Sequence, residues 1–320
     1  MRKVSLLLVI VMLVLIPPMG SANENGVGNG DFNFQCGGAC HGDATLNASS
    51  QATITLVTEQ AAYEGLAFGV RVHISNLQTS ENQLVGVFLL SSMNGANDHP
   101  QKEGWTILSN SAGTTTNYVE LEVSGLTEVF VDWTLRAPLT GEYELYAAIH
   151  HGSDVGEKAF IGSVLEPLTI SVQEVPENLP RLSPEFKPPT SRPLGVSTKI
   201  EVNTIAVDTF KIEWKINGGE IRTANVTQLD STTWEFELPP ALTAHSLEWR
   251  AILDGEGPQQ TSPWFQMKAV DVEFEMTSLE SYAQALAFFL CGIAIVWSLT
   301  LMTTTKPSQG EKTFVVEGEE

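Results

Sequence analysis

The feature that most constrains the fold of this chain is a succession of short apolar runs, rich in β-branched and aromatic residues and separated by glycine or proline. Seven such runs lie within residues 45–174, and they cover residues 52–58, 66–75, 84–91, 117–123, 127–135, 142–150 and 160–172. Their partial alternation of apolar and polar side chains is typical of strands with one buried face. This part of the chain therefore predicts an antiparallel β-sandwich.

A second group of β-type runs occupies residues 196–275. The runs cover residues 198–207, 209–216, 220–226, 232–238, 246–252 and 261–272. Asn217, Gly218 and Gly219 form a hairpin-turn sequence between two of them. We expect a sandwich of the immunoglobulin or fibronectin type III kind, without the antibody-type disulfide because this stretch contains no cysteine. The predicted fold class is all-β, with two antiparallel β-sandwich domains.

Residues 175–195 separate the two groups and are rich in proline. The prolines stand at positions 176, 180, 184, 188, 189 and 193, among charged and polar residues. Such a composition favours extended backbone, so the sequence predicts a semi-rigid linker between the two domains.

The charge balance is strongly acidic, with 38 Asp and Glu residues against 17 Lys and Arg residues and a formal net charge of -21. A surface of this sign disfavours binding to nucleic acid or to anionic lipid headgroups. The chain has three cysteines, so it cannot be a small domain held together by several disulfides.

Residues 23–44 form a lead-in that contains a CxxxCH motif made by Cys36, Cys40 and His41. Two thiols followed at once by an imidazole is the order used for covalent attachment of haem c, with the histidine as an iron ligand. The spacing between the cysteines is one residue longer than the usual haem motif. A Cys36–Cys40 disulfide or a metal site completed by His41 are the alternatives.

The two ends of the chain carry export and anchoring signals. Residues 1–22 resemble a signal peptide, with Arg2 and Lys3 before an apolar core, although an uncleaved N-terminal anchor is an alternative. Residues 281–305 contain no charged side chain, which predicts a transmembrane helix rather than a buried core helix. The tail over residues 306–320, in which Lys306 and Lys312 follow the apolar stretch, is expected in the cytoplasm. The expected location is the cell membrane, with a single-pass type I topology and most of the chain outside.

Two further stretches accompany the CxxxCH motif. Trp133 to Pro138 read Trp-Thr-Leu-Arg-Ala-Pro, and Tyr143 to Gly152 read Tyr-Glu-Leu-Tyr-Ala-Ala-Ile-His-His-Gly. With the motif, residues 30–175 resemble the prokaryotic Reeler-like domains, related to the N-terminal domain of reelin and also called choice-of-anchor domains. The resemblance implies a surface-exposed β-sandwich that can carry a haem, and it implies no catalytic activity.

His150 and His151 are the candidates for a second axial ligand opposite His41. Neighbouring side chains of a strand point to opposite faces, so one of the pair at most can face a given iron. His151 is the better candidate because an even number of positions separates it from Tyr143, Leu145 and Ile149. In a strand it would therefore point to the same face as these residues, which mark the buried face. The alternative is that both histidines are polar loop residues.

These features predict a membrane-anchored, cell-surface, c-type cytochrome-like protein that transfers electrons through one covalent haem. Its partner would be a redox protein or a quinone-linked electron carrier. The sequence contains no nucleotide-binding, metalloprotease or nucleophile-elbow motif, so we expect that the chain is not an enzyme. A non-haem surface adhesion or structural protein with a Cys36–Cys40 disulfide is the alternative.

Overall fold

The computed structural model describes residues 48–77, 84–94, 98–123, 125–152, 160–271 and 278–304. Residues 48–271 contribute to one compact unit, and the C-terminal helix belongs to a second one. The predicted signal peptide, the lead-in and the predicted cytoplasmic tail lie outside the described residues.

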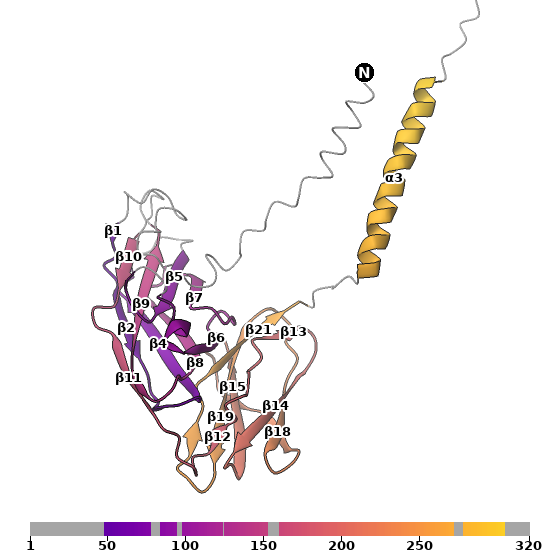
Figure 1. Ribbon diagram of the computed structural model, residues 1–320. Helices are drawn as coiled ribbons and strands as arrows, with labels where there is room; N and C mark the ends of the chain where they lie inside the picture. The colour runs from indigo at the N-terminus through magenta and orange to yellow at the C-terminus, as the bar shows by residue number, and fades with distance from the viewer. Residues whose placement is uncertain are drawn as a thin grey trace, which may run out of the picture. The chain divides into compact units, whose positions relative to one another are not determined.

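The first sandwich consists of two sheets, which Figure 1 shows in indigo to magenta. Its strands are β1 (Ala48–Ser49), β2 (Thr53–Val57), β3 (Ala62–Tyr63), β4 (Ala67–Ser75), β5 (Leu84–Leu90), β6 (Thr106–Asn110), β7 (Tyr118–Glu122), β8 (Glu128–Arg136), β9 (Gly141–His151), β10 (Phe160–Ser163) and β11 (Leu168–Gln173). One sheet has the order β2-β4-β8-β6. In the other, β9 pairs with β5 on one side and with β10 and β11 on the other. A 3-10 helix, η3 (Pro100–Glu103), precedes β6.

Alternating side chains build the core of this sandwich. In β4 every second residue is buried, and Val72 and Ile74 are fully enclosed. Trp105 and Trp133 are also buried, and the ring of Trp105 packs against that of Phe68. Because burying a large aromatic side chain contributes much of the folding free energy, these residues anchor the two sheets to each other.

The second sandwich is drawn in salmon to orange in Figure 1. Its strands are β12 (Arg181–Leu182), β13 (Ser191–Pro193), β14 (Thr198–Ile205), β15 (Thr209–Ile216), β16 (Arg222–Thr223), β17 (Asn225–Gln228), β18 (Thr233–Leu238), β19 (Ser246–Asp254), β20 (Gln260–Thr261) and β21 (Phe265–Val270). One sheet has the order β12-β14-β18-β17 and the other β13-β21-β19-β15-β16, with β20 beside β19. This is the strand order of an immunoglobulin-type sandwich, whose first, second, fifth and fourth strands share one sheet.

The predicted hairpin between β15 and β16 is confirmed. Asn217 and Gly218 both have positive φ, at 47° and 69°, and the N–H of Gly219 donates to the Ile216 carbonyl over 2.8 Å. Positive φ at both central residues is the requirement of the two-residue turn that matches the twist of a hairpin.

The proline-rich segment differs from the predicted linker because it forms part of the second sandwich. Its strand β12 pairs with β14, and β13 runs parallel to β21. Leu179, Leu182 and Arg192 are buried. Proline is compatible with these short edge strands, since an edge residue needs no hydrogen bond on its outer side.

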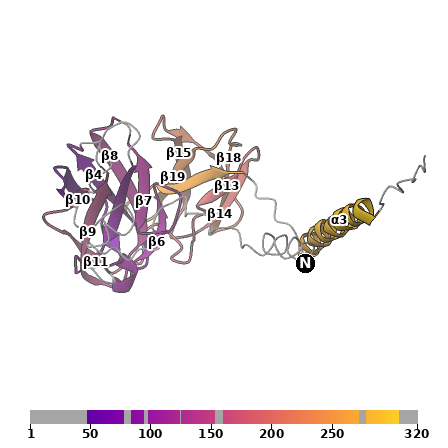
Figure 2. The same ribbon diagram turned by 90° about the horizontal axis from the view of Figure 1, so that it is seen from above.

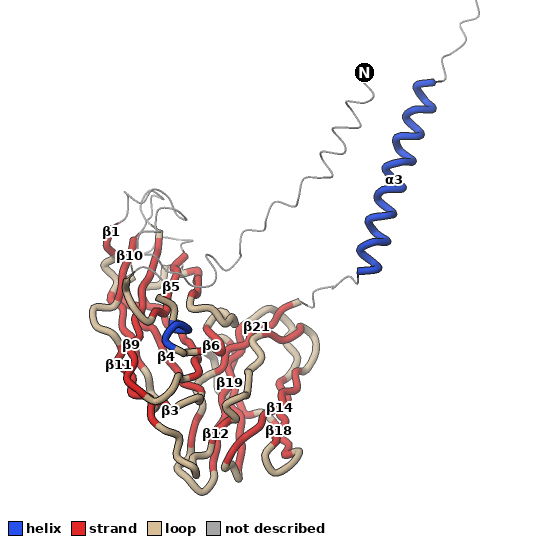
Figure 3. Tube along the Cα trace, in the orientation of Figure 1, coloured by secondary structure: helices blue, strands red, loops and turns tan. Residues whose placement is uncertain are grey.

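The two sandwiches lie side by side within the same compact unit, as the view from above shows (Figure 2). Leu108 of β6 packs into the core of the second sandwich. Figure 3 shows strands through both sandwiches, and the described residues confirm an all-β fold apart from η3 and the C-terminal helix.

The C-terminal helix, α3, spans Ser278–Thr304. In the part of the chain that the structure describes, no helix is both long enough and apolar enough to cross a membrane. The transmembrane helix expected over residues 281–305 is therefore not supported by the structure and stays a prediction.

Candidate functional site

The structure describes part of the site that the sequence predicts. Cys36, Cys40 and His41 lie outside the described residues. The two candidate ligands His150 and His151 are described, and they close strand β9. Among the described residues, no group of three or more His, Cys, Asp or Glu side chains could hold a metal ion.

His151 faces the protein interior, as its parity predicts. Its exposed fraction is 6%, and its ring stacks on that of Phe160 at a centroid distance of 5.1 Å. Its Nδ1 lies 3.1 Å from the carbonyl oxygen of Gly152, and its Nε2 lies 2.9 Å from Oγ of Ser50. Because a carbonyl oxygen can only accept, Nδ1 carries the proton, and Nε2 of the neutral ring accepts from the Ser50 hydroxyl.

The environment of His151 favours the neutral imidazole. Burial lowers the pKa of His151 below its ordinary value, and the hydrogen bond to the Gly152 backbone opposes this shift only in part. A neutral imidazole with its Nδ1–H bound to a carbonyl is the form in which histidine can ligate a metal through Nε2.

His150 points to the opposite face of β9 and is half-buried. Its ring meets the edge of Phe88 at a centroid distance of 5.7 Å. Its neighbours across the strands are Ile161 of β10 and Gly86 of β5. The structure thus separates the two candidate ligands onto two faces of one sheet.

Strand β1 lies at this end of the sandwich. Ala48 and Ser49 pair in parallel with β10, and the N–H of Ser50 donates to the Ile161 carbonyl over 2.8 Å. Oγ of Ser50 also accepts the N–H of Ala52 over 3.1 Å. Residues 48–50 are therefore fixed beside the end of β9.

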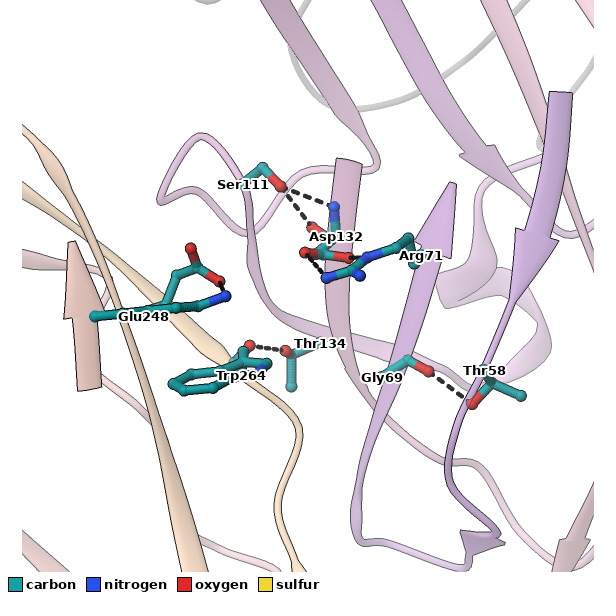
Figure 4. Close-up of polar contacts among 9 residues, drawn as sticks. Thr58, Gly69, Arg71, Ser111, Asp132, Thr134, Glu248 and Trp264 are labelled. Carbon is teal, nitrogen blue, oxygen red and sulfur yellow. Dashed lines mark hydrogen bonds and ion pairs between the residues drawn. The ribbon is translucent and has the colours of Figure 1, made fainter. Parts of the chain in front are cut away.

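A polar junction joins the two sandwiches, and the sequence analysis did not identify it (Figure 4). On the side of the first sandwich, Arg71 donates two hydrogen bonds to Asp132, over 2.7 Å and 2.9 Å. Thr134 Oγ1 donates to the carbonyl oxygen of Trp264 in the second sandwich over 2.7 Å. The N–H of Gln266 donates to Oγ of Ser109 over 3.1 Å.

The second sandwich contributes two ion pairs around an aromatic ring at this junction. Lys215 binds Glu248 and Arg250 binds Glu213, over 2.9 Å and 2.7 Å. The Lys215 ammonium and the Arg250 guanidinium each lie 4.4 Å from the centre of the Trp264 ring. Each cation is matched by a carboxylate and an aromatic face within the second sandwich. The hydrogen bonds of Thr134 and Gln266 are the contacts here that cross to the first sandwich.

The comparisons with known proteins do not identify a family. No protein-family model matches the chain, and no curated protein sequence does. Among solved structures, a marsupial T cell receptor is 11% identical, with a TM-score of 0.22, over 72% of this chain and 76% of the receptor chain. Titin Ig tandem domains are 9% identical, with a TM-score of 0.23, over 69% of this chain and 100% of theirs. Tandem Ig repeats of Dlar are 10% identical, with a TM-score of 0.26, over 69% and 99%. At these TM-scores the likeness carries no argument about function.

Proposed function

We propose that this chain is a cell-surface, c-type cytochrome-like electron carrier with one covalent haem at Cys36, Cys40 and His41. The observation that supports it most is the hydrogen bond between Ser50 and His151. Nine residue steps separate His41 from Ser50, so an extended chain holds their Cα atoms within about 30 Å. The motif would therefore be within reach of the end of β9 that carries both candidate ligands.

The chemistry of the residues fits such a group. Two thiols can bind the porphyrin covalently, His41 can ligate the iron on one side, and a neutral histidine can ligate it on the other. His151 has the required protonation state and tautomer, and its Nε2 would exchange the Ser50 hydroxyl for the iron. His150, on the outer face of β9, is the competing ligand. The haem would supply one-electron chemistry, and the protein would hold and orient it.

The proposal includes the family and the location that the sequence indicates. Residues 30–175 would form a Reeler-like domain, and residues 281–305, which carry no charged side chain, would anchor the chain in the cell membrane. Electrons would be exchanged with a redox protein or a quinone-linked carrier. Fractionation of cells that express the chain with and without residues 278–320 tests the anchor.

Haem attachment is tested by a pyridine haemochrome spectrum of the chain produced with cytochrome maturation factors. We expect the spectrum of covalent haem in the parent and none in a Cys36→Ala and Cys40→Ala double variant. His151→Ala and His150→Ala, compared by their visible absorption bands, identify the second ligand. A haem-free parent would contradict the proposal.

A surface adhesion or structural protein is the second candidate, and the junction between the sandwiches favours it. The hydrogen bond from Thr134 to Trp264 joins the two sandwiches within one compact unit, and an ion pair and a cation–π contact stabilise the second sandwich beside it, as a spacing module requires. In this case Cys36 and Cys40 would form a disulfide. Intact mass spectrometry would show a chain two hydrogens lighter than the fully reduced form and without porphyrin.

A further inference from the structure

A cavity of about 440 Å³ lies where the two sandwiches meet, apart from the histidine end of the first sandwich. Its wall includes Leu66 of the first sandwich, Leu182 and Phe186 of the proline-rich segment, and Leu253 of β19. Pockets for small molecules have volumes of about 300–1,000 Å³ and often form between domains. Size and position therefore suit a small organic ligand.

The charged side chains in the wall are positive on balance, although the whole chain is acidic. The charged side chains that line the cavity are Arg136, Arg181, Arg250 and Glu59. Arg250 is paired with Glu213. Arg181 donates only to backbone carbonyl oxygens of residues 176, 177 and 179 among the described residues. Neutral oxygens do not compensate a guanidinium charge, so the cavity favours an anion.

Arg136 is placed to recognise that anion. Its Nη2 donates to the Phe186 carbonyl over 2.6 Å, which is its one side-chain hydrogen bond among the described residues. A guanidinium has five N–H donors in a planar fork, so further donors can serve a ligand. Burial lowers the pKa of Arg136, but an arginine of this kind stays charged at neutral pH.

Two hydrogen bonds across the junction hold the cavity walls together. One is the bond from Arg136 to Phe186, and the other runs from Nε2 of Gln60 to the Thr261 carbonyl over 2.8 Å. Because both sandwiches contribute to the wall, the cavity exists only in the joined unit. A preformed wall lowers the ordering cost of binding.

We propose that this cavity binds a small organic carboxylate with an apolar body, and that Arg136 binds its carboxylate group. The planar guanidinium matches a carboxylate through two parallel hydrogen bonds. The leucine side chains and Phe186 would cover the apolar body. The size of the cavity excludes a folded protein partner inside it.

Isothermal titration of the purified full chain with phenylacetate and octanoate tests the proposal. Phenylacetamide, which has nearly the shape of phenylacetate without its charge, is the matched ligand control. We expect both acids to bind and the amide to bind about tenfold more weakly, since a charge-assisted hydrogen bond is lost. Failure of both acids to bind at millimolar concentration, or equal binding of acid and amide, would overturn the proposal.

Single-residue variants test which side chain binds the carboxylate of the ligand. Arg136→Gln should weaken phenylacetate binding about tenfold, whereas Arg222→Gln should not change it, because Arg222 is exposed and does not line the cavity. Glu59→Gln should strengthen binding because it removes the carboxylate of the wall. If Arg136→Gln does not fold, Arg136→Lys is the second variant. It keeps the positive charge but loses the two parallel N–H donors, so it should bind phenylacetate more weakly than the parent. Unchanged affinity in a folded Arg136 variant would overturn the role of this residue.

Discussion

Oγ of Ser50 lies 2.9 Å from Nε2 of His151, and this contact joins residues 101 positions apart. It fixes Ser50, nine positions after His41, to the end of β9. The Gly152 carbonyl defines the tautomer of this buried histidine, in which Nε2 is left to accept from Ser50. The contact thus joins the chain just after the predicted haem-attachment segment to a proposed iron ligand.

Removing the Ser50 hydroxyl should destabilise the first sandwich. Ser50→Ala leaves Nε2 of His151 and the N–H of Ala52 without this partner, so we expect a loss of about 1–2 kcal/mol in the free energy of unfolding. Urea denaturation of the haem-free protein measures it. Ser231→Ala, at an exposed turn position, is the control and should be neutral. Equal stability of both variants would show that the Ser50 contact is energetically unimportant.

Stability should fall on acidification because of His151. Burial lowers the pKa of His151 in the folded state below the ordinary histidine value of 6.5, so the unfolded chain takes up a proton first as the pH falls. Stability from this group is therefore complete above about pH 6.5 and is lost between that value and the lower folded pKa. Urea denaturation of haem-free protein at pH 7.5 and 5.5 measures the difference. His151→Gln should reduce it, and an unchanged difference would contradict the assignment.

The hydrogen bond from Thr134 to the Trp264 carbonyl, which crosses between the sandwiches, should contribute to the stability of the whole unit. Thr134→Val conserves the shape of a side chain that is 1% exposed but leaves the Trp264 carbonyl unpaired, so we expect a loss of about 1–2 kcal/mol. Thr209→Val, at an exposed position of β15, is the matched control. A calorimetric scan checks both, and an unchanged transition in Thr134→Val would contradict a stabilising role.

Replacing Gly257 by alanine should destabilise the fold, because Gly257 packs against the proline-rich segment. A Cβ there would collide with the carbonyl oxygen of Asn178 and approach Pro180. Because backbone cannot yield as a flexible side chain does, Gly257→Ala should cost about 1–3 kcal/mol. Gly141→Ala, whose Cβ would meet the Tyr143 ring at an ordinary 3.4 Å, is the control. A neutral Gly257→Ala, measured by urea denaturation, would show that the segment is not packed as described.

Local sequence patterns predicted the elements whose side chains alternate. The buried face of β9, including His151, and the turn at Asn217 and Gly218 follow from parity and from turn chemistry. The run expected over residues 160–172 is two strands instead, β10 and β11, because the chain turns before Pro167. A single sequence pattern does not reveal such a break when both halves are apolar.

The features that sequence did not predict depend on partners distant in the chain. Strands β12 and β13 exist because β14 and β21 offer them an edge, which a proline-rich composition does not indicate. The alternation of Glu213 and Lys215 also occurs on solvent-exposed strands, so it could not show that this face meets the first sandwich. Trp264 contacts the first sandwich through its backbone carbonyl, and a backbone contact leaves no mark in the local sequence.

The measurement that tests the central proposal most directly is the pyridine haemochrome spectrum of the chain after expression with cytochrome maturation factors. The proposal predicts covalent haem in the parent and none in the Cys36→Ala and Cys40→Ala double variant. It also predicts a changed spectrum in His151→Ala or His150→Ala, whichever removes the second ligand. A parent without haem, with Cys36 and Cys40 joined by a disulfide, would contradict the cytochrome proposal and support the surface adhesion or structural protein.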